Sequence, residues 1–444
     1  MTDQYHLVCG LEIHAELKTA SKMFCGCKND PFGASQPNSH TCSVCLGMPG
    51  GIPVPNKKAI EWTIKLGLFL GCKINLHSKF DRKNYFYPDL AKGYQISQYD
   101  LPFCCDGQIE TSEGIVRIER IHLEEDAGKL IHDEINGEKV SLIDFNRSGV
   151  PLVEIVTKPD IKTPTQAVEY AKKLREAIRY LGIGDGDMEK GGMRLEANIS
   201  LQTQTQEKNG ELPAYKVEVK NINSFNFMQQ AITFEIDRQS ELLDAGQQIE
   251  QETRGFNSAK QITFSQRSKG NAADYRYFPD PDIPSLVFTN QQIEVWRQEL
   301  PPTQTAISEQ WAEKFALSSK ESAFFLENRD LTNFALALWQ EASRRQLPVD
   351  RLAKVIINKK IDWRVDEPAA AIVERFLAAT AVDDFDETAA LAVVESVLSE
   401  NQDALQRYRS GQKQVIGFFV GEVMKKIGKK VDARQIKELI ESKL

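Results

Sequence analysis

An alternating stretch near the N-terminus, residues 10–17, constrains the fold more than any other feature of the sequence. Its apolar residues occupy every second position, and Glu12, His14 and Glu16 occupy the positions between them. Because the side chains of a strand point alternately to its two faces, this pattern predicts a half-buried β-strand. Two carboxylates and an imidazole on one face indicate a site for a divalent cation or for proton transfer. The alternative is a surface strand whose polar face is simply hydrated.

Further strands place carboxylates in apolar surroundings. Residues 115–126 alternate and then end in the run Glu124-Glu125-Asp126. Adjacent carboxylates repel one another unless a cation neutralises them, so this strand end is a candidate metal site. Glu154 stands alone in an apolar strand, where an unpaired carboxylate is costly. Glu196 and Glu218 lie in two later strands and share a face with other polar residues.

The order of these elements favours the α+β class. About the first 280 residues predict a mostly antiparallel sheet with one acidic face, and helices such as residues 164–181 would cover the other face. Residues 57–71 predict a further amphipathic helix. Regular alternation of strands and helices, which would indicate a parallel sheet, is not seen in the sequence.

Four of the eight cysteines form two close pairs. Cys25 and Cys27 have C-x-C spacing, and Cys42 and Cys45 have C-x-x-C spacing. Each pair presents two thiolates to one ion, so residues 25–45 predict a zinc knuckle whose four thiolates leave no open position for water. The alternatives are disulfides, which a reducing compartment disfavours, or free thiols.

Length and charge limit the remaining possibilities. The 444 residues exceed what one core usually supports, so two or three domains are expected. No apolar run reaches the ~20 residues that span a bilayer, and no secretory signal is evident, so we expect a cytoplasmic protein. The net charge is −8, but residues 401–444 contain ten Lys/Arg against five Asp/Glu. A basic tail on an acidic body is typical of local contact with nucleic acid, or of a solvated helical face.

A charged and aromatic segment, residues 78–89, follows the first predicted helix. Its aromatic residues would anchor the loop while Lys79 and Arg82 present donors to an anion such as phosphate or carboxylate. The alternative is an ordered surface loop with internal ion pairs.

Several long motifs together resemble the B subunit of the aspartyl/glutamyl-tRNA amidotransferases. The motifs are Gly10–His14, the four-cysteine knuckle, Lys79–Asp89, Tyr94–Gln98, His122–Lys129, Val219–Phe225 and Asp274–Asp282. They span about residues 5–285, and the resemblance resumes at about 395–444.

The resemblance implies ATP-dependent transamidation in two steps. The protein would phosphorylate the side-chain carboxylate of Glu-tRNA(Gln) or Asp-tRNA(Asn), and ammonia from a glutaminase partner, the A subunit, would then displace phosphate. A small third partner, the C subunit, would brace the pair. The implied architecture is a catalytic cradle over residues 1–290, similar to the glutamine synthetase/guanido kinase fold, a helical connector over 291–380 and a helical, tRNA-binding tail over 381–444.

The resemblance also implies a set of metal-binding side chains. Carried onto this sequence, the magnesium ligands are Glu12, His14, Glu125 and Glu218, with Glu154 beside them. Among these, Glu125 and Glu154 are the predicted catalytic carboxylates. Phosphoryl transfer needs cations that offset the charge of the γ-phosphate, and an acidic sheet face supplies their ligands.

Other residues are implied to act on ammonia and ATP. Lys83 and Asp274 correspond to a Lys–acid pair at the mouth of the family's ammonia channel, where a carboxylate would take a proton from ammonium. Lys79 and Arg82 would hold phosphate. The sequence has no G-x-x-x-x-G-K-[ST] run, so ATP would be held by Mg²⁺ and side chains. With the zinc knuckle, the expected cofactors are ATP, Mg²⁺ and Zn²⁺.

Two departures and two rival functions complete the prediction. Glu196 stands where the family usually has the shorter Asp, and the connector over about 290–395 is shorter than usual. One rival is a small-molecule carboxylate–amine ligase of the glutamine synthetase kind, which would act on free glutamate. The other is a zinc-stabilised nucleic-acid scaffold, which would not turn over ATP.

Overall fold

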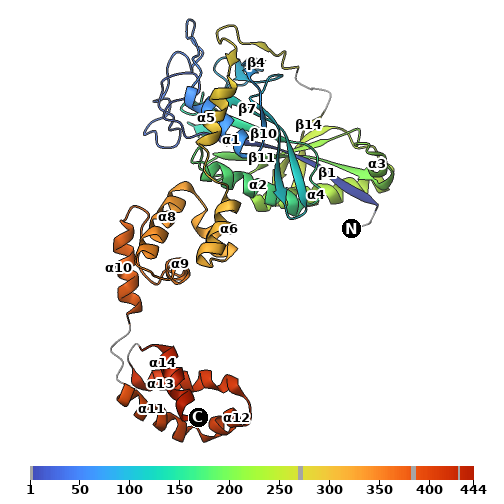
Figure 1. Ribbon diagram of the computed structural model, residues 1–444. Helices are drawn as coiled ribbons and strands as arrows, with labels where there is room; N and C mark the ends of the chain where they lie inside the picture. The colour runs from blue at the N-terminus through green and yellow to red at the C-terminus, as the bar shows by residue number, and fades with distance from the viewer. Residues whose placement is uncertain (1–3, 269–273, 382–386, 429–430) are drawn as a thin grey trace. The chain divides into compact units, whose positions relative to one another are not determined.

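The fold comes from a computed structural model, which describes residues 4–268, 274–381, 387–428 and 431–444. Contacts divide the chain into two compact units. The first unit comprises Met1–Glu309 with Phe325–Arg329, and the second comprises Gln310–Phe324 with Asp330–Leu444. The first contains every strand of the described chain, and the second is helical (Figure 1). The α+β class predicted from the sequence is confirmed, whereas the domain boundaries at 290 and 380 stay predictions.

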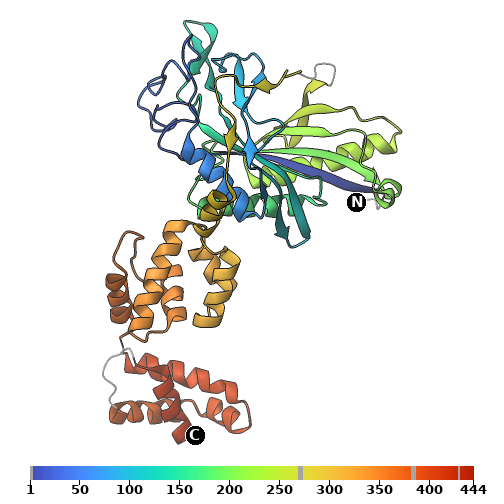
Figure 2. The same cartoon turned by 45° about the horizontal axis from the view of Figure 1, so that its top comes forward.

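The first unit is built on one nine-stranded sheet with the order β14-β13-β12-β11-β1-β10-β7-β6-β2. Its strands are β1 (Tyr5–Glu16), β2 (Lys73–Ile74), β6 (Cys104–Thr111), β7 (Gly114–Glu125), β10 (Pro151–Thr157), β11 (Met193–Thr203), β12 (Val217–Ile222), β13 (Glu252–Asn257) and β14 (Ile262–Ser268). Neighbouring strands are antiparallel except for β12 and β13, which are parallel. The alternating N-terminal stretch is therefore a strand, and β1, dark blue in Figure 2, runs through the middle of the sheet.

Short sheets and helices surround this sheet. The short sheets comprise β3 (His77–Ser78) with β16 (Leu286–Val287), β4 (Asp81–Asn84) with β5 (Tyr94–Ser97) and β15 (Phe278–Pro279), and the hairpin β8 (Lys129–Ile135) with β9 (Glu138–Asp144). The helices of the first part of the chain are α1 (Lys57–Phe69), α2 (Pro164–Tyr180), α3 (Gln204–Asn209), α4 (Phe225–Asp244) and α5 (Asn290–Gln298). The later helices are α6 (Gln304–Phe315), α7 (Ser319–Phe325), α8 (Arg329–Arg344), α9 (Val349–Ile357), α10 (Ala369–Thr380), α11 (Glu387–Glu400), α12 (Gln402–Arg409), α13 (Ile416–Ile427) and α14 (Ala433–Lys443).

Local capping explains where the two helices predicted from the sequence begin. The Asn56 side chain accepts hydrogen bonds from the backbone N–H groups of Lys58 and Ala59 at the start of α1. Thr163 caps α2 in the same way, and Pro164 occupies its first position, where no N–H is needed. Within the described ranges, no helix is long and apolar enough to cross a membrane.

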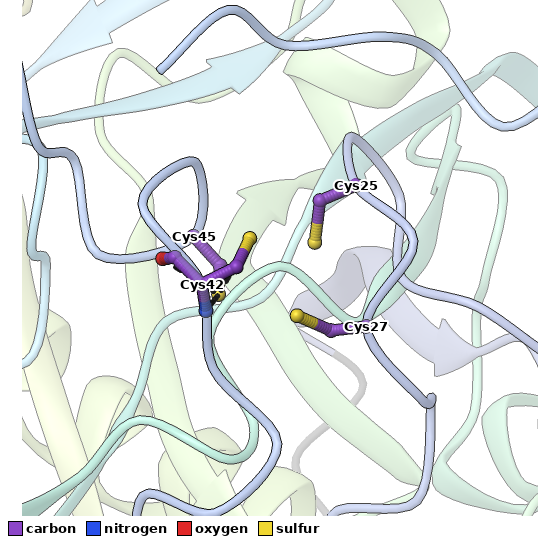
Figure 3. Close-up of side chains that lie close together, drawn as sticks. All are labelled: Cys25, Cys27, Cys42 and Cys45. Atoms are coloured by element: carbon purple, nitrogen blue, oxygen red, sulfur yellow. Dashed lines mark hydrogen bonds between the residues drawn. The ribbon is translucent and has the colours of Figure 1, made fainter. Parts of the chain in front are cut away.

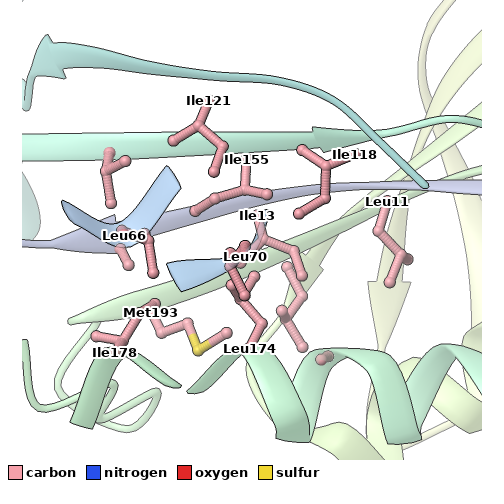
Figure 4. Packing of buried hydrophobic residues seen from close by; sticks show 14 of the residues in the cluster. Leu11, Ile13, Leu66, Leu70, Ile118, Ile121, Ile155, Leu174, Ile178 and Met193 are labelled. Atoms are coloured by element: carbon pink, nitrogen blue, oxygen red, sulfur yellow. The ribbon is translucent and has the colours of Figure 1, made fainter. Parts of the chain in front are cut away.

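The apolar face of the sheet packs against α1, α2 and α4 to form the main core. On β1, Leu11, Ile13 and Ala15 are fully buried, as the period-two pattern predicts. Figure 4 shows strand side chains meeting helix side chains in this layer. The labelled residues are Leu11, Ile13, Leu66, Leu70, Ile118, Ile121, Ile155, Leu174, Ile178 and Met193.

We expect Ile13→Ala to lower the free energy of unfolding by about 2–5 kcal/mol, because the truncated side chain leaves a cavity in a closely packed core. Urea denaturation followed by circular dichroism measures the change. Ile131→Ala is the matched control, since Ile131 is 40% exposed on β8, and its cost should stay below about 0.5 kcal/mol. Equal costs for the two variants would contradict the assignment of the core face.

A bulge sets which residues of β7 face the core. Val156 of β10 pairs with Arg120, but the next residue, Thr157, pairs with Ile118, so Glu119 is an extra residue on β7. Because of this residue, Ile118 and Ile121 both point into the core although they are three positions apart. The first and third residues after Ile121 consequently point to the opposite, polar face of the sheet.

Candidate active site

The polar face of the sheet forms a pocket of about 450 Å³ on the side opposite the core. Strands β1, β7, β10 and β12 contribute acidic side chains to it, and three basic side chains lie among them. The charged lining residues are Glu12, Glu124, Glu154, Glu218, His122, Lys83, Arg120 and Lys220. The predicted acidic sheet face is therefore present, and it is hollowed into a site.

A row of alternating histidine and glutamate side chains crosses three strands at the pocket floor. In the register of the sheet, Glu154 of β10 lies between His14 of β1 and His122 of β7. The Oε2 atom of Glu154 is 3.3 Å from the Nε2 atoms of both His14 and His122. Glu124 closes the group, since its carboxylate oxygens lie 3.7 Å from each imidazole.

Charge balance in this row changes the protonation of all its members. Burial opposes protonation of His14, but the hydrogen bond and charge of Glu154 raise the pKa of His14 to about 9. The charge of Glu154 outweighs burial in the same way at His122, whose pKa is raised to about 9. In return, His122 and His14 hold the pKa of Glu154 well below its usual range against the effect of burial. A metal ion bound here would therefore displace protons from the imidazoles.

A second carboxylate group lies beside this row, towards the β12 side. Glu12, Glu196 and Glu218 each offer an oxygen within 4.8 Å of the others; we call these three residues the carboxylate trio. Burial, together with the charges of Glu154 and Glu196, raises the pKa of Glu12 to about 7. The longer side chain noted at Glu196 thus reaches the site.

Basic and aromatic residues also line the pocket. Lys83 lies with its Nζ atom 4.8 Å from the ring centre of Tyr275, and Tyr99 stacks on Tyr277 with ring centres 4.4 Å apart. Arg120 approaches Glu154, with 3.8 Å between Nη2 and Oε1. Lys83 comes from β4, outside the main sheet, whereas Arg120 comes from β7 and lies beside the carboxylates of the floor, so the pocket can hold anions and divalent cations together.

The structure brings four of the predicted site residues into this face and places Glu125 elsewhere. Glu12, His14, Glu154 and Glu218 all belong to the metal-capable groups described above. The Glu125 carboxylate instead binds the Lys92 ammonium and accepts a 3.0 Å hydrogen bond from the Ile96 N–H.

We therefore replace Glu125 by Glu124 in the candidate ligand set. Adjacent strand residues point to opposite faces, and Glu124 shares the face of His122.

Lys79 and Arg82 also lie outside the pocket lining. The Lys79 ammonium pairs with Asp81 and Asp100, and Arg82 pairs with Asp280 and Asp282. These ion pairs fasten the loop and the small β4-β5-β15 sheet, which matches the alternative of an ordered loop with internal ion pairs. Their side chains are therefore engaged structurally, and we do not retain them as phosphate ligands.

Of the predicted pair Lys83 and Asp274, only Lys83 is among the residues that line the pocket. Lys83 lines the pocket, and the charges of Glu124 and Glu154 raise its pKa despite burial. Asp274 is exposed, and its Oδ1 atom accepts a 3.1 Å hydrogen bond from the Arg276 N–H. Both residues belong to the described chain, and no ion pair joins them. The role of Asp274 in proton removal stays a prediction.

Sequence reasoning missed His122, Glu124, Arg120 and Lys220. A signal for the first two was present: Ile121 and Leu123 are apolar, so His122 and Glu124 had to share the opposite face. Lys220 stands two positions after Glu218 and shares its face by the same rule. Arg120 carried no such signal, because the bulge beside it interrupts the alternation.

The four grouped cysteines come together on two facing loops near the end of β7 (Figure 3). Their sulfur atoms lie within 4.8 Å of one another, and the Cys42 and Cys45 sulfurs are 3.9 Å apart. A tetrahedral ion with Zn–S bonds of about 2.3 Å places its sulfur ligands about 3.8 Å apart, so the donors fit zinc in kind and spacing. All eight cysteines lie in the described part of the chain, and all are free thiols.

A fully buried lysine supports one of these sulfurs. Lys22 donates to the carbonyl of Phe145 at 3.2 Å and to Cys45 Sγ at 3.9 Å, and no carboxylate lies within ion-pair distance of it among the described residues. A hydrogen bond from Cys25, the Cys42 N–H and the Lys22 charge lower the pKa of Cys45 to about 5 against the effect of burial. These contacts favour the thiolate of Cys45, the form that binds metal.

Comparisons with known proteins identify a family for both parts of the chain. Residues 7–294 match the family model described as GatB/GatE catalytic domain, and residues 350–444 match the one described as GatB domain. Similar curated proteins carry the name of the B subunit of aspartyl/glutamyl-tRNA(Asn/Gln) amidotransferase. One from Thermodesulfovibrio yellowstonii is 41% identical over 480 residues, covering 98% of both chains, and one from Thermotoga maritima is 40% identical over 488 residues, covering 99% of both.

These alignments are longer than the 444 residues of this chain, so the relatives contain segments that it lacks. The shorter length leaves the two matched regions in place, since the family models together cover residues from both compact units. Matches of this identity over nearly the full length are decisive, and the chain belongs to the family of aspartyl/glutamyl-tRNA(Asn/Gln) amidotransferase B subunits.

Proposed function

We propose that this protein catalyses the ATP-dependent amidation of Glu-tRNA(Gln) and/or Asp-tRNA(Asn), with ammonia delivered by a glutaminase, the A subunit, and with the C subunit in the same complex. One observation carries the proposal: five carboxylates from neighbouring strands lie together at a pocket that Lys83, Arg120 and Lys220 also line. Phosphoryl transfer needs this pairing of cation ligands with groups that bind phosphate.

The carboxylate-rich floor suits Mg²⁺, which prefers hard oxygen ligands. The carboxylate trio, together with His14, Glu124 and Glu154, would hold it. Bound Mg²⁺ would supply positive charge that offsets the negative charge of the phosphates. The likeness of the cradle to the glutamine synthetase/guanido kinase fold belongs to this proposal.

In the first step, a carboxylate oxygen of the aminoacyl group attacks the γ-phosphorus of ATP, and the bond to ADP breaks. In the second, ammonia attacks the acyl carbon and inorganic phosphate leaves, while one proton departs from nitrogen. Lys83 and Arg120 are placed to orient the phosphoryl oxygens during both steps, because both line the pocket beside the carboxylates. Tyr275 keeps the Lys83 ammonium in position through a cation–π contact.

We further propose that Cys25, Cys27, Cys42 and Cys45 bind a structural Zn²⁺. The two loops that contribute these thiols contain little regular secondary structure that could hold them in place. Ser148 donates a 3.0 Å hydrogen bond to the Cys45 carbonyl, so the cluster is fastened to the chain just before β10. Zinc would therefore stabilise the region that leads into the Glu154 strand.

The C-terminal part is proposed to contact tRNA. Residues 401–444 have an excess of five basic over acidic residues, whereas the whole chain is acidic. Helices α11 and α13–α14 form a small core of their own around Phe419 and Ile436, which keeps the charged side chains of α13 and α14 at the surface. Phosphate contacts of this kind make binding depend on salt concentration.

The test is ATP hydrolysis by the chain co-expressed with the A and C subunits. Four substrates are compared: Glu-tRNA(Gln), Asp-tRNA(Asn), uncharged tRNA and free glutamate. Turnover that requires a misacylated tRNA supports the proposal and identifies the substrate. Turnover with free glutamate would replace it by the small-molecule ligase, and silence with all four would leave the zinc-stabilised nucleic-acid scaffold.

A further inference from the structure

Lys220 occupies a special place among the basic residues of the pocket, because it is bonded to the carboxylate trio itself. Its Nζ atom lies 2.9 Å from Glu196 Oε2 and 3.5 Å from Glu218 Oε1. The charge of Glu12 acts on it as well. Lys83 lines the same pocket, yet it forms no ion pair with the trio among the described residues.

Two of the carboxylates that Lys220 pairs with, Glu196 and Glu218, are also members of the trio that could bind a metal. Glu12, Glu196 and Glu218 converge within 4.8 Å, a spacing suited to one shared cation. A carboxylate oxygen directed at a divalent ion is not also directed at an ammonium, and two cations at this point would repel each other. The Lys220 ammonium and a divalent cation therefore compete for the same carboxylates.

Other contacts allow the trio to keep its shape when the lysine leaves. The Thr253 hydroxyl donates a 2.9 Å hydrogen bond to Glu218 Oε2, the oxygen that Lys220 does not bind. Glu12 and Glu196 are paired directly across β1 and β11 in the sheet register. Lys220 itself is 37% exposed at its side chain and stands on a flexible four-carbon stem, so it can swing without a backbone change.

We propose that Lys220 is a counter-cation that exchanges with the divalent metal: metal binding to the trio releases its ammonium into the pocket, where it binds the phosphate groups of ATP. The inference rests on the proposed function, since it assumes a metal at the trio and ATP in the pocket. Lys220 then acts twice, first by neutralising three neighbouring carboxylates and later by adding a positive charge where phosphate charge accumulates.

The first test measures Mn²⁺ binding in the absence of nucleotide, by calorimetry on the complex with the A and C subunits. Lys220→Met removes the competitor, so we expect Mn²⁺ to bind about three- to fivefold more tightly than in the wild type, the value of a partly exposed ion pair. Lys83→Met is the matched control, because it removes the same charge from the same pocket without touching the trio.

The outcomes separate the inference from the proposed function. No Mn²⁺ binding by the wild type would refute the metal site on which the proposed function depends. Wild-type binding with unchanged or weaker affinity in Lys220→Met would overturn the exchange alone. An equal gain in Lys83→Met would also overturn it, because the effect would then be the general field of the pocket.

A second measurement uses the unmodified protein and so does not depend on a variant that folds. The rate of Lys220 acetylation is followed by mass spectrometry. Saturating Mg²⁺ should raise this rate, because the released ammonium becomes accessible, and Mg²⁺ with a non-hydrolysable ATP analogue should lower it again. A rate that Mg²⁺ leaves unchanged would contradict the release, and a lack of protection by the analogue would contradict the contact with phosphate.

Discussion

Glu124→Gln should reduce tRNA-dependent ATP turnover by about a hundredfold or more, whereas Glu125→Gln should leave turnover within a few fold of the wild type. The two residues are neighbours on β7 with identical side chains, but they point to opposite faces of the sheet. Glu124 faces His14, His122 and the pocket. Glutamine is nearly the same size as glutamate, but it lacks the negative charge that binds a cation.

The Glu125 variant is the control for folding and for the face assignment. Its carboxylate pairs with Lys92, so loss of the charge should lower thermal stability without changing the pocket. Turnover, Mn²⁺ affinity and melting temperature are measured for both variants. A Glu125→Gln protein that keeps its stability but loses ATP turnover and Mn²⁺ binding would restore Glu125 to the ligand set and remove Glu124 from it.

Cys45→Ser should abolish zinc binding and cost about 3–5 kcal/mol in the stability of the first unit, the cost of leaving a buried charge without its partner. Lys22 is 0% exposed, and Cys45 is its only charge partner among the described residues. Replacing the thiolate by a neutral hydroxyl leaves that ammonium buried and uncompensated. The loss of metal adds to this cost, because a structural zinc site contributes its binding energy to folding.

Elemental analysis for zinc and thermal denaturation check this prediction, with Cys105→Ser as the control. Cys105 is a partly exposed thiol outside the cluster, so its replacement should change neither zinc content nor melting temperature. Addition of a chelator to the wild type should reproduce the Cys45→Ser melting curve only in part, because the Cys45 thiolate still faces Lys22. Identical melting of Cys45→Ser and wild type would mean that the cluster plays no structural role.

The sequence determined the sheet and its two faces well, because burial imposes a strict period of two. Leu11, Ile13 and Ala15 could lie in the core only if Glu12 and His14 lay on the other side. The cysteine loops were equally readable, since two short spacings suffice to bring four sulfurs together. In both cases, local geometry fixes the position of the side chain.

Positions that depend on partners distant in the sequence could not be read in the same way. Arg82 had the composition of a phosphate ligand, yet Asp280 and Asp282 engage it from about 200 residues away. The Lys92 ammonium that engages Glu125 likewise comes from a separate segment of the chain. The ion pair between Lys220 and Glu196 likewise forms only because β12 and β11 are neighbours in the sheet.

The pocket depends on the number of residues in β7 as well as on their side chains, because Glu119 is an extra residue in that strand. The Glu119 side chain is exposed on the bulge and lies outside the pocket lining, where its carboxylate is 3.4 Å from the Arg120 guanidinium. A residue must nevertheless be present at this position. Without it, the side chains at the end of β7 would exchange faces of the sheet, and Ile121 and Leu123 would enter the pocket in place of His122 and Glu124. We therefore expect a deletion at the bulge to disrupt the pocket more than a substitution of Glu119 does. The phase of β7, set by one unpaired residue, decides whether His122 and Glu124 belong to the acidic face.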